Sequence, residues 1–168
     1  MGMKKHPLWT AIFQHGGHDE SIALMNFIGD SPLFSSLSKR ELRNLTSILH
    51  HRTYQDGEAV FLKGQPGAAM FIINSGQVNV VDYDKDGRAV VIATLNPGDF
   101  FGELALLDDS PRSASAVVTM PSVIYAISRA DLERLLSSSP QIGMRVYHAL
   151  AVIIGARLRN ANAQLSEQ

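Results

Sequence analysis

Residues 96–118 read NPGDFFGELALLDDSPRSASAVV. In this stretch Gly98 and Gly102 predict turns with positive φ, which other residues adopt only at a cost. The residues after Gly102 are expected to form one short helical turn, whose unpaired N–H groups and partial positive charge suit a phosphate. Glu103 can accept a hydrogen bond from a ribose hydroxyl, and Arg112 can donate to two phosphate oxygens at once. The stretch therefore predicts a site for a phosphorylated ribose.

Two neighbouring residues extend the predicted phosphate site. Ser113 adds a hydroxyl group, and the backbone amides of Ser113 and Ala114 can complete an anion-binding nest. The alternative interpretation is a buried turn in which Glu103 and Arg112 form an incidental ion pair.

The stretch resembles the phosphate-binding cassette of the cyclic-nucleotide-binding domain, which occurs in the bacterial catabolite activator protein and in the regulatory subunit of cyclic-AMP-dependent protein kinase. The resemblance rests on FGELAL followed by PRSA, where glycines, acid, aliphatics, proline and arginine fall at the family spacing. It begins near Pro32 and ends near Leu165. Glycines also stand where the family has turns, at Gly57, Gly64, Gly67, Gly76, Gly98 and Gly102.

The resemblance implies a ligand and a set of contacts. Cyclic AMP is the expected ligand, with cyclic GMP or another cyclic nucleotide as the alternative. Arg112, Ser113 and Ala114 would hold the phosphate, and Gly102 and Glu103 the ribose. The purine would lie against an aliphatic and aromatic wall formed by Val80, Ile92, Leu95, Phe101 and Leu104. Three residues of a C-terminal helix would cap the base: Arg157, Asn160 and Ala161. Ser113, which occurs at this position in bacterial cyclic-AMP receptors, and an adenine contact from Asn160 favour cyclic AMP over cyclic GMP.

The composition is that of an ordinary globular protein, with 168 residues, 45% hydrophobic and 18% charged. A net charge of −1 argues against binding nucleic acid through a basic surface. The chain has no cysteine, so disulfides are excluded. We find no signal peptide and no apolar run long enough for a bilayer, and we expect a cytoplasmic protein.

The order of elements predicts a mainly β fold with flanking helices. Leucines and isoleucines at helical spacing predict a helix over 36–50, capped by Ser36 or Ser38. Short strands follow at Tyr54, Val60–Leu62, Met70–Ile73, Val78–Val81, Ala89–Thr94, Ala116–Val118 and Val123–Ile127, with a hairpin at Asp84–Gly87. Strands this short and regularly spaced predict a jelly roll, or double-stranded β-helix.

The chain is expected to divide into three parts. Residues 1–30 would form a helical extension, residues 31–138 the β-roll with its cassette at 98–118, and residues 139–168 a capping and dimerisation helix. A short helix is predicted over 131–137, and Pro140 begins the long helix. That helix carries two apolar stripes, and two stripes imply two burial partners. They consist of Ile142, Val146, Ala149, Ile153 and Ala156, and of Tyr147, Leu150, Ile154, Leu158 and Leu165. In the family that the chain resembles, one face of this helix packs on the β-roll and the other pairs with a second subunit. The resemblance therefore implies a homodimer through the second stripe, and a helix buried in its own domain is the alternative.

The first 30 residues are weakly patterned. Trp9, Ile12 and Phe13 suggest a short apolar helix, which His15–His18 would break, and a second short helix is expected over 21–28. His15 and His18 could bind a metal, but no further ligand stands at a recognised spacing, so we expect a solvated loop and no metal site.

Other function classes have less support in the sequence. A metal-dependent cupin enzyme needs inward-facing histidines, and the chain has none between Arg52 and Tyr147. Asp108 and Asp109 are adjacent on a predicted loop, which disfavours a catalytic carboxylate pair. Ser113 and Ser115 have no nearby base. We therefore expect no catalysis, but a cyclic-nucleotide sensor that changes shape or assembly and acts on a separate protein.

Two expectations concern what the sensor contacts. In transcription factors of the family a helix-turn-helix domain follows the long helix. This chain stops at Gln168, so no direct DNA binding is expected. The alternative to a sensor is a module of the same fold that acts through protein contacts and binds no nucleotide.

Overall fold

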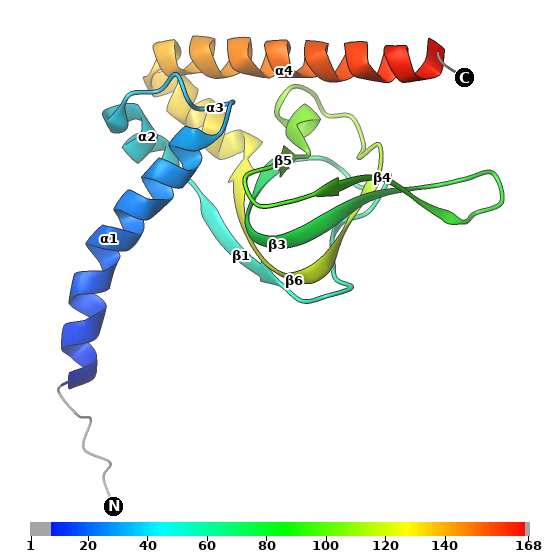
Figure 1. Cartoon of the computed structure of the whole chain (residues 1–168). Coiled ribbons are helices and arrows are strands. Elements are labelled where there is room, and N and C mark those ends of the chain that lie inside the picture. Colours follow the sequence, from blue (N-terminus) through cyan, green and yellow to red (C-terminus); the bar gives the residue numbers. More distant parts are fainter. Residues whose placement is uncertain (1–7, 167–168) are drawn as a thin grey trace, which may run out of the picture.

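The computed structural model describes the backbone of residues 8–166 and the side chains of residues 19–163 and 166. An antiparallel β-sheet forms its centre, and helices cover one end of the sheet (Figure 1). The elements in chain order are α1 (Leu8–Asp30), α2 (Lys39–Thr46), β1 (His50–Tyr54), β2 (Ala59–Phe61), β3 (Ala69–Tyr83), β4 (Ala89–Leu95), β5 (Phe100–Phe101), the 3₁₀ turn η1 (Glu103–Leu106), β6 (Ser115–Ser128), α3 (Arg129–Ser138) and α4 (Pro140–Ser166).

Two long strands organise the sheet. Its order is β1-β6-β3-β4, with β2 paired to β6 and β5 paired to β3. β3 and β6 pair from Ala69 opposite Ser128 to Val81 opposite Ser115, with register shifts near Gly76. Each of these strands was predicted as two short ones. They are continuous because bulges bend a long strand without ending it.

The bend requires glycine at position 76. Gly76 has φ of 92°, and a Cβ there would lie 2.0 Å from Ser122 Oγ. The fold class predicted from the sequence, a jelly-roll β domain with flanking helices and a long C-terminal helix, is confirmed.

The core has two parts. One lies between the helices and the end of the sheet, and its fully buried side chains include Ile28, Leu45, Ile127, Leu132 and Leu150. The other lies inside the curved sheet and includes Ile73, Val78, Ala116, Val118 and Ile124. The cassette at residues 98–118 lies next to both parts, so packed strands hold its ends.

Hydrogen bonds between nearby residues set the start of α2 and the turn of the predicted hairpin. Ser38 caps α2, and its backbone N–H donates to Glu41 Oε2 at 2.7 Å in a capping box. Asp84 Oδ1 accepts the backbone N–H groups of Asp86 and Arg88 and closes the predicted hairpin. The Ser38 cap, the Asp84 hairpin, α3 and the start of α4 at Pro140 confirm the sequence predictions. The helix predicted over 36–50 is shorter than expected, because α2 ends at Thr46 and β1 begins at His50.

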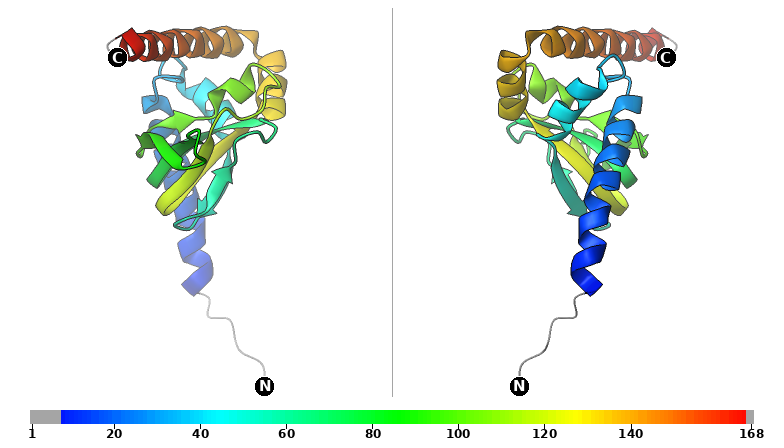
Figure 2. Two further views of the ribbon diagram at one scale, coloured as in Figure 1. Left: turned by 90° about the vertical axis from the view of Figure 1, so that its right-hand side faces the viewer. Right: turned by 90° about the vertical axis from the view of Figure 1, so that its left-hand side faces the viewer.

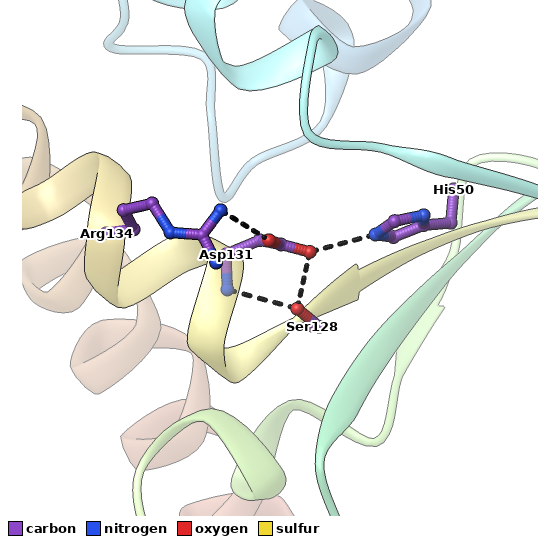
Figure 3. Close-up of polar contacts among 4 residues, drawn as sticks. All are labelled: His50, Ser128, Asp131 and Arg134. Carbon is purple, nitrogen blue, oxygen red and sulfur yellow. Dashed lines mark hydrogen bonds and ion pairs between the residues drawn. The ribbon is translucent and has the colours of Figure 1, made fainter.

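A polar cluster fixes the start of α3 to β1 (Figure 3). Asp131 Oδ2 lies 2.9 Å from His50 Nε2 and accepts the hydroxyl of Ser128 at 2.7 Å. Arg134 lies 3.3 Å from the other carboxylate oxygen. The hydrogen bond with His50, followed by that from Ser128, holds the pKa of Asp131 below its usual value.

The break predicted at His15–His18 is wrong. α1 runs without interruption from Leu8 to Asp30, through Gly16 and Gly17, and its N-terminal part extends beyond the sheet (Figure 2). A glycine inside a helix costs only about 1 kcal/mol relative to alanine. The C-terminal part of α1 is also anchored, because Met25 and Ile28 are buried in the core.

Two predictions on this segment lie outside the described side chains. They are the apolar face of Trp9, Ile12 and Phe13 and the possible metal ligands His15 and His18.

α4 lies across the end of the sheet as one long helix (Figure 1). Ile142, Val146, Leu150, Ile153 and Ile154 all pack against the core of the same chain. Leu150 and Ile154 were predicted to face a second subunit, and this is wrong. They lie beside the first stripe on the helix surface and share its buried face, whereas Tyr147 and Leu158 of the second stripe are exposed.

The opposite side of α4 carries the exposed apolar side chains. These are Met144, Tyr147, Val152 and Leu158. The side chain of Leu165, also predicted at an interface, lies outside the described residues. None of the helices in the described part of the chain is long and apolar enough to cross a membrane.

Candidate functional site

A cavity of about 310 Å³ lies between the cassette and α4. The lining residues come from elements far apart in the sequence: Phe61 from β2, Val80 from β3, Phe101 from β5, Gly102–Ala105 at η1, Asp108 and Ser110–Ala114 from the loop before β6, and Arg157 from α4. Apolar walls with a few convergent polar groups are typical of a small-molecule site.

Two glycines shape the cassette around this cavity. Gly98 has φ of 93°, and its N–H donates to Ile73 O at 2.8 Å, which joins the loop to β3. Gly102 caps η1 in the left-handed conformation, with φ of 71°. A Cβ at Gly102 would lie 2.7 Å from the Arg112 Nη1 atom. Gly102 therefore provides both the turn and the space for the arginine, and the predicted positive φ values are confirmed.

Arg112 lies in the wall of the cavity with its side chain held from several sides. Its Nη1 donates to Gly102 O at 3.1 Å and its Nη2 to Ala69 O at 2.7 Å. The ring centre of Phe61 lies 4.1 Å from the guanidinium carbon. Neutral groups therefore make all of these contacts.

No described residue is a direct counterion of Arg112. Among the described residues, none of the ion pairs includes Arg112. Its Nε is buried without a hydrogen-bond partner. Burial lowers the pKa of this arginine, while the negative charge of Glu103 acts in the opposite direction. A partly buried cation with an unused donor is suited to an anionic ligand.

Glu103 is buried and bound to α4. Its Oε1 lies 2.6 Å from Arg157 Nη1, and Arg157 Nη2 donates to Phe100 O at 3.3 Å. The guanidinium of Arg157 also lies 4.9 Å from the ring centre of Phe100. The partner of Glu103 is thus Arg157, and not Arg112 as the alternative interpretation of the cassette supposed. Through this contact the long helix reaches the cavity directly.

A protein-family model, described as the cyclic nucleotide-binding domain, matches residues 51–139. The chain belongs to this family. The resemblance seen in the sequence is thereby confirmed. The matched residues contain the cassette and all six strands, except for His50 at the start of β1.

Relatives of this cyclic nucleotide-binding domain come from several kinds of protein. The "Cyclic AMP receptor protein" of Thermus thermophilus is 35% identical over 80% of this chain and 61% of its own length. The "cAMP-dependent protein kinase regulatory subunit" of Yarrowia lipolytica is 32% identical over 74% of this chain and 32% of its own length. The chain therefore spans less than two thirds of either protein.

A solved structure has the same fold. The crystal structure of a cyclic nucleotide-binding domain from Methylobacillus flagellatus has a TM-score of 0.77 at 27% identity, covering 89% of this chain and 85% of that one. The two curated relatives are named as a receptor and a regulatory subunit.

The structure brings most of the predicted site residues of this domain to one cavity. Those that line it are Val80, Phe101, Gly102, Glu103, Leu104, Arg112, Ser113, Ala114 and Arg157. Four predicted residues lie elsewhere: Ile92, Leu95, Asn160 and Ala161.

The four outliers have local causes. The pairing of β3 with β4 shifts register between Val80 and Val81, which leaves Ile92 without a partner and 59% exposed. Leu95 packs against the core inside the sheet. Asn160 and Ala161 are exposed and lie about 4.5–6 Å beyond Arg157 along α4.

The cavity also contains residues that sequence reasoning missed. Phe61, Ala105, Asp108, Ser110 and Pro111 line it. Phe61 gave no signal, since β2 is distant from Arg112 in the sequence and only its pairing with β6 brings the ring to the site. Asp108 was considered as an acid–base residue or as a turn cap, and not as part of this cavity.

Proposed function

We propose that this chain is a cyclic-nucleotide sensor whose cavity binds the cyclic phosphate at Arg112. The observation that carries the proposal is the state of that arginine. Its guanidinium is partly buried, and within the part of the chain that the structure describes it has no ion-pair partner and its Nε–H has no acceptor. A bound phosphate supplies both the negative charge and the acceptors.

The other cavity residues fit the remaining parts of a nucleotide. Ser113 and Ala114 adjoin Arg112 and can add donors to the phosphate, and Glu103 can accept a ribose hydroxyl. Val80, Phe101 and Leu104 provide an apolar wall for the base. We propose binding without catalysis.

Cyclic AMP is the ligand that we propose. The support is the name of the Thermus relative, a cyclic AMP receptor, and Ser113 beside the phosphate-binding arginine. We expect cyclic AMP to bind more tightly than cyclic GMP by about tenfold, the yield of one good hydrogen bond.

The signal would pass through α4. A ribose hydroxyl at Glu103 competes with Arg157 for the same carboxylate, which is 7% exposed. Binding therefore weakens or redirects a contact that holds α4 over the cavity. Because the outer side of α4 exposes Met144, Val152 and Leu158, we propose that it forms a homodimer and that its change is read by a separate protein.

Calorimetric titration tests the ligand directly. The full chain is titrated with cyclic AMP, cyclic GMP and cyclic di-GMP, with 5′-AMP as the matched non-cyclic control. Saturable binding of cyclic AMP, ahead of the others, supports the proposal. Binding of none of the three removes it and favours a module that acts through protein contacts alone.

A further inference from the structure

We infer that Phe61 is a positioning residue, which holds the Arg112 guanidinium in place for a cyclic phosphate. The inference rests on the proposed function. Phe61 is the last residue of β2 and lines the cavity. Its ring centre lies 4.1 Å from the guanidinium carbon, and the ring of Phe71 lies 5.6 Å from it. A cation within about 6 Å of an aromatic face is attracted by the ring quadrupole.

The aromatic face supplies what the hydrogen bonds do not. The carbonyls of Gly102 and Ala69 hold Nη1 and Nη2, but they leave the guanidinium free to tilt about the line between these nitrogens. A ring against its face restricts that tilt. An arginine side chain loses much conformational freedom when it is fixed, so contacts made before the ligand arrives reduce the entropy lost on binding.

Phe61 is itself held by a fixed base. Its ring centre lies 5.7 Å from that of Phe71 and 5.9 Å from that of Phe101. Those two rings stack at 5.4 Å and are buried. A Cβ at Gly102 would lie 3.4 Å from Phe61 Cε1, so there is little free space on that side of the ring. The ring is thus placed between a buried aromatic pair and the cation.

A second role is compatible with the position of Phe61, because a residue that lines the cavity can touch the ligand's base. The two roles differ in what they predict. Positioning of Arg112 affects the phosphate, which all cyclic nucleotides share. Stacking on the base makes the effect depend on which base is present, since bases differ in stacking strength.

The test is calorimetric titration of the full chain with cyclic AMP, cyclic GMP and cyclic CMP. We expect Phe61→Leu to weaken binding of each nucleotide that the native chain binds by the same factor, about fivefold to tenfold. Phe61→Tyr keeps the aromatic face and should stay within about twofold of the native affinity. In an Arg112→Lys background the loss from Phe61→Leu should shrink to less than about twofold, because the planar group is gone.

Each outcome decides a different statement. Native chain that binds none of the nucleotides refutes the proposed function. Native binding with an unchanged Phe61→Leu affinity refutes the inference alone. A loss that differs among the three bases, or that Phe61→Tyr does not restore, also refutes it, because the ring then acts on the base or only on packing. If Phe61→Leu does not give a native circular-dichroism spectrum, Phe61→Met, which is unbranched and similar in volume, takes its place.

Discussion

Removal of the Arg112 side chain is the sharpest test of the phosphate site. In Arg112→Ala the cavity loses a positive charge that forms no ion pair among the described residues. Truncating one partner of a buried charge-assisted pair costs about 2–5 kcal/mol. Because the guanidinium of Arg112 is only partly buried, we expect the lower half of this range, which is about 30-fold to 300-fold in affinity.

The fold should tolerate this change. The substitution leaves the carbonyls of Gly102 and Ala69 without their donor, but it also removes a buried charge and the unpartnered Nε. These effects on stability oppose each other, so the free energy of unfolding should change much less than the free energy of binding.

A thermal-shift assay reports on both the stability of the variant and its ligand binding in one experiment. At a cyclic AMP concentration of about 100 times the native Kd, the native protein gains about 2.7 kcal/mol and a hundredfold weaker variant only about 0.4 kcal/mol. In a chain of this size the shift in Tm should fall from about 5–10 °C to about 1–2 °C. Arg145→Ala is the matched control, since Arg145 pairs with Glu41 outside the cavity. An Arg112→Ala protein with the native ligand-induced shift would contradict the phosphate assignment.

Three further predictions address the ribose, the interface and pH. Glu103→Gln should lose much less affinity than the native chain when 2′-deoxy cyclic AMP replaces cyclic AMP, and equal losses in titration would give Glu103 another role. Leu158→Asp should convert a native dimer into a folded monomer in sedimentation. Ile154→Asp instead places a charge in the chain's own core and should lower the Tm. A native chain that sediments as a monomer would exclude this interface. The pKa of Asp131 is lowered in the folded state, so its stabilising effect should be complete above the ordinary aspartate pKa of about 4 and should disappear as pH falls through the lowered value. The difference in Tm between the native chain and Asp131→Asn should therefore vanish in acid. A difference in Tm that stays constant with pH would refute this.

Local chemistry explains what could be predicted from the sequence. The capping box at Ser38 and Glu41, the Asp84 hairpin and the turn at Gly102 depend on residues within a few positions of each other, so a single segment specifies them. The family resemblance likewise lies in one contiguous stretch. Fold class and the centre of the candidate site followed from such segments.

Contacts between distant segments determine the features that could not be predicted from the sequence. Whether residues 70–73 and 78–81 form one strand or two depends on β6, which stays paired across the bulge at Gly76. The ring of Phe61 reaches Arg112 only through the pairing of β2 with β6. Ile92 lies outside the cavity because the pairing of β4 with β3 shifts register, and a pattern of hydrophobic residues does not predict such a shift.

α1 and α4 show the same limit for helices. Gly16 and Gly17 lower helix propensity, but propensity is a weak guide in a helix whose C-terminal turns are anchored by Met25 and Ile28. The faces of α4 could be read as two stripes, and only the packing showed that the chain's own core also covers Leu150 and Ile154 of the second stripe.

The order of the strands has a consequence for how the protein is made. β6 is the last strand, and it pairs with β1, β2 and β3. While the ribosome has not yet released Ser115–Ser128, β1 and β2 have no strand to pair with, and only the β3–β4 hairpin and β5 can form local sheet. Contacts of such long sequence separation form slowly, because a large loop must close first. The nascent chain therefore exposes the apolar strands β3 and β4 for the whole time that the cassette is being synthesised, and holdase chaperones should bind it most strongly in that interval.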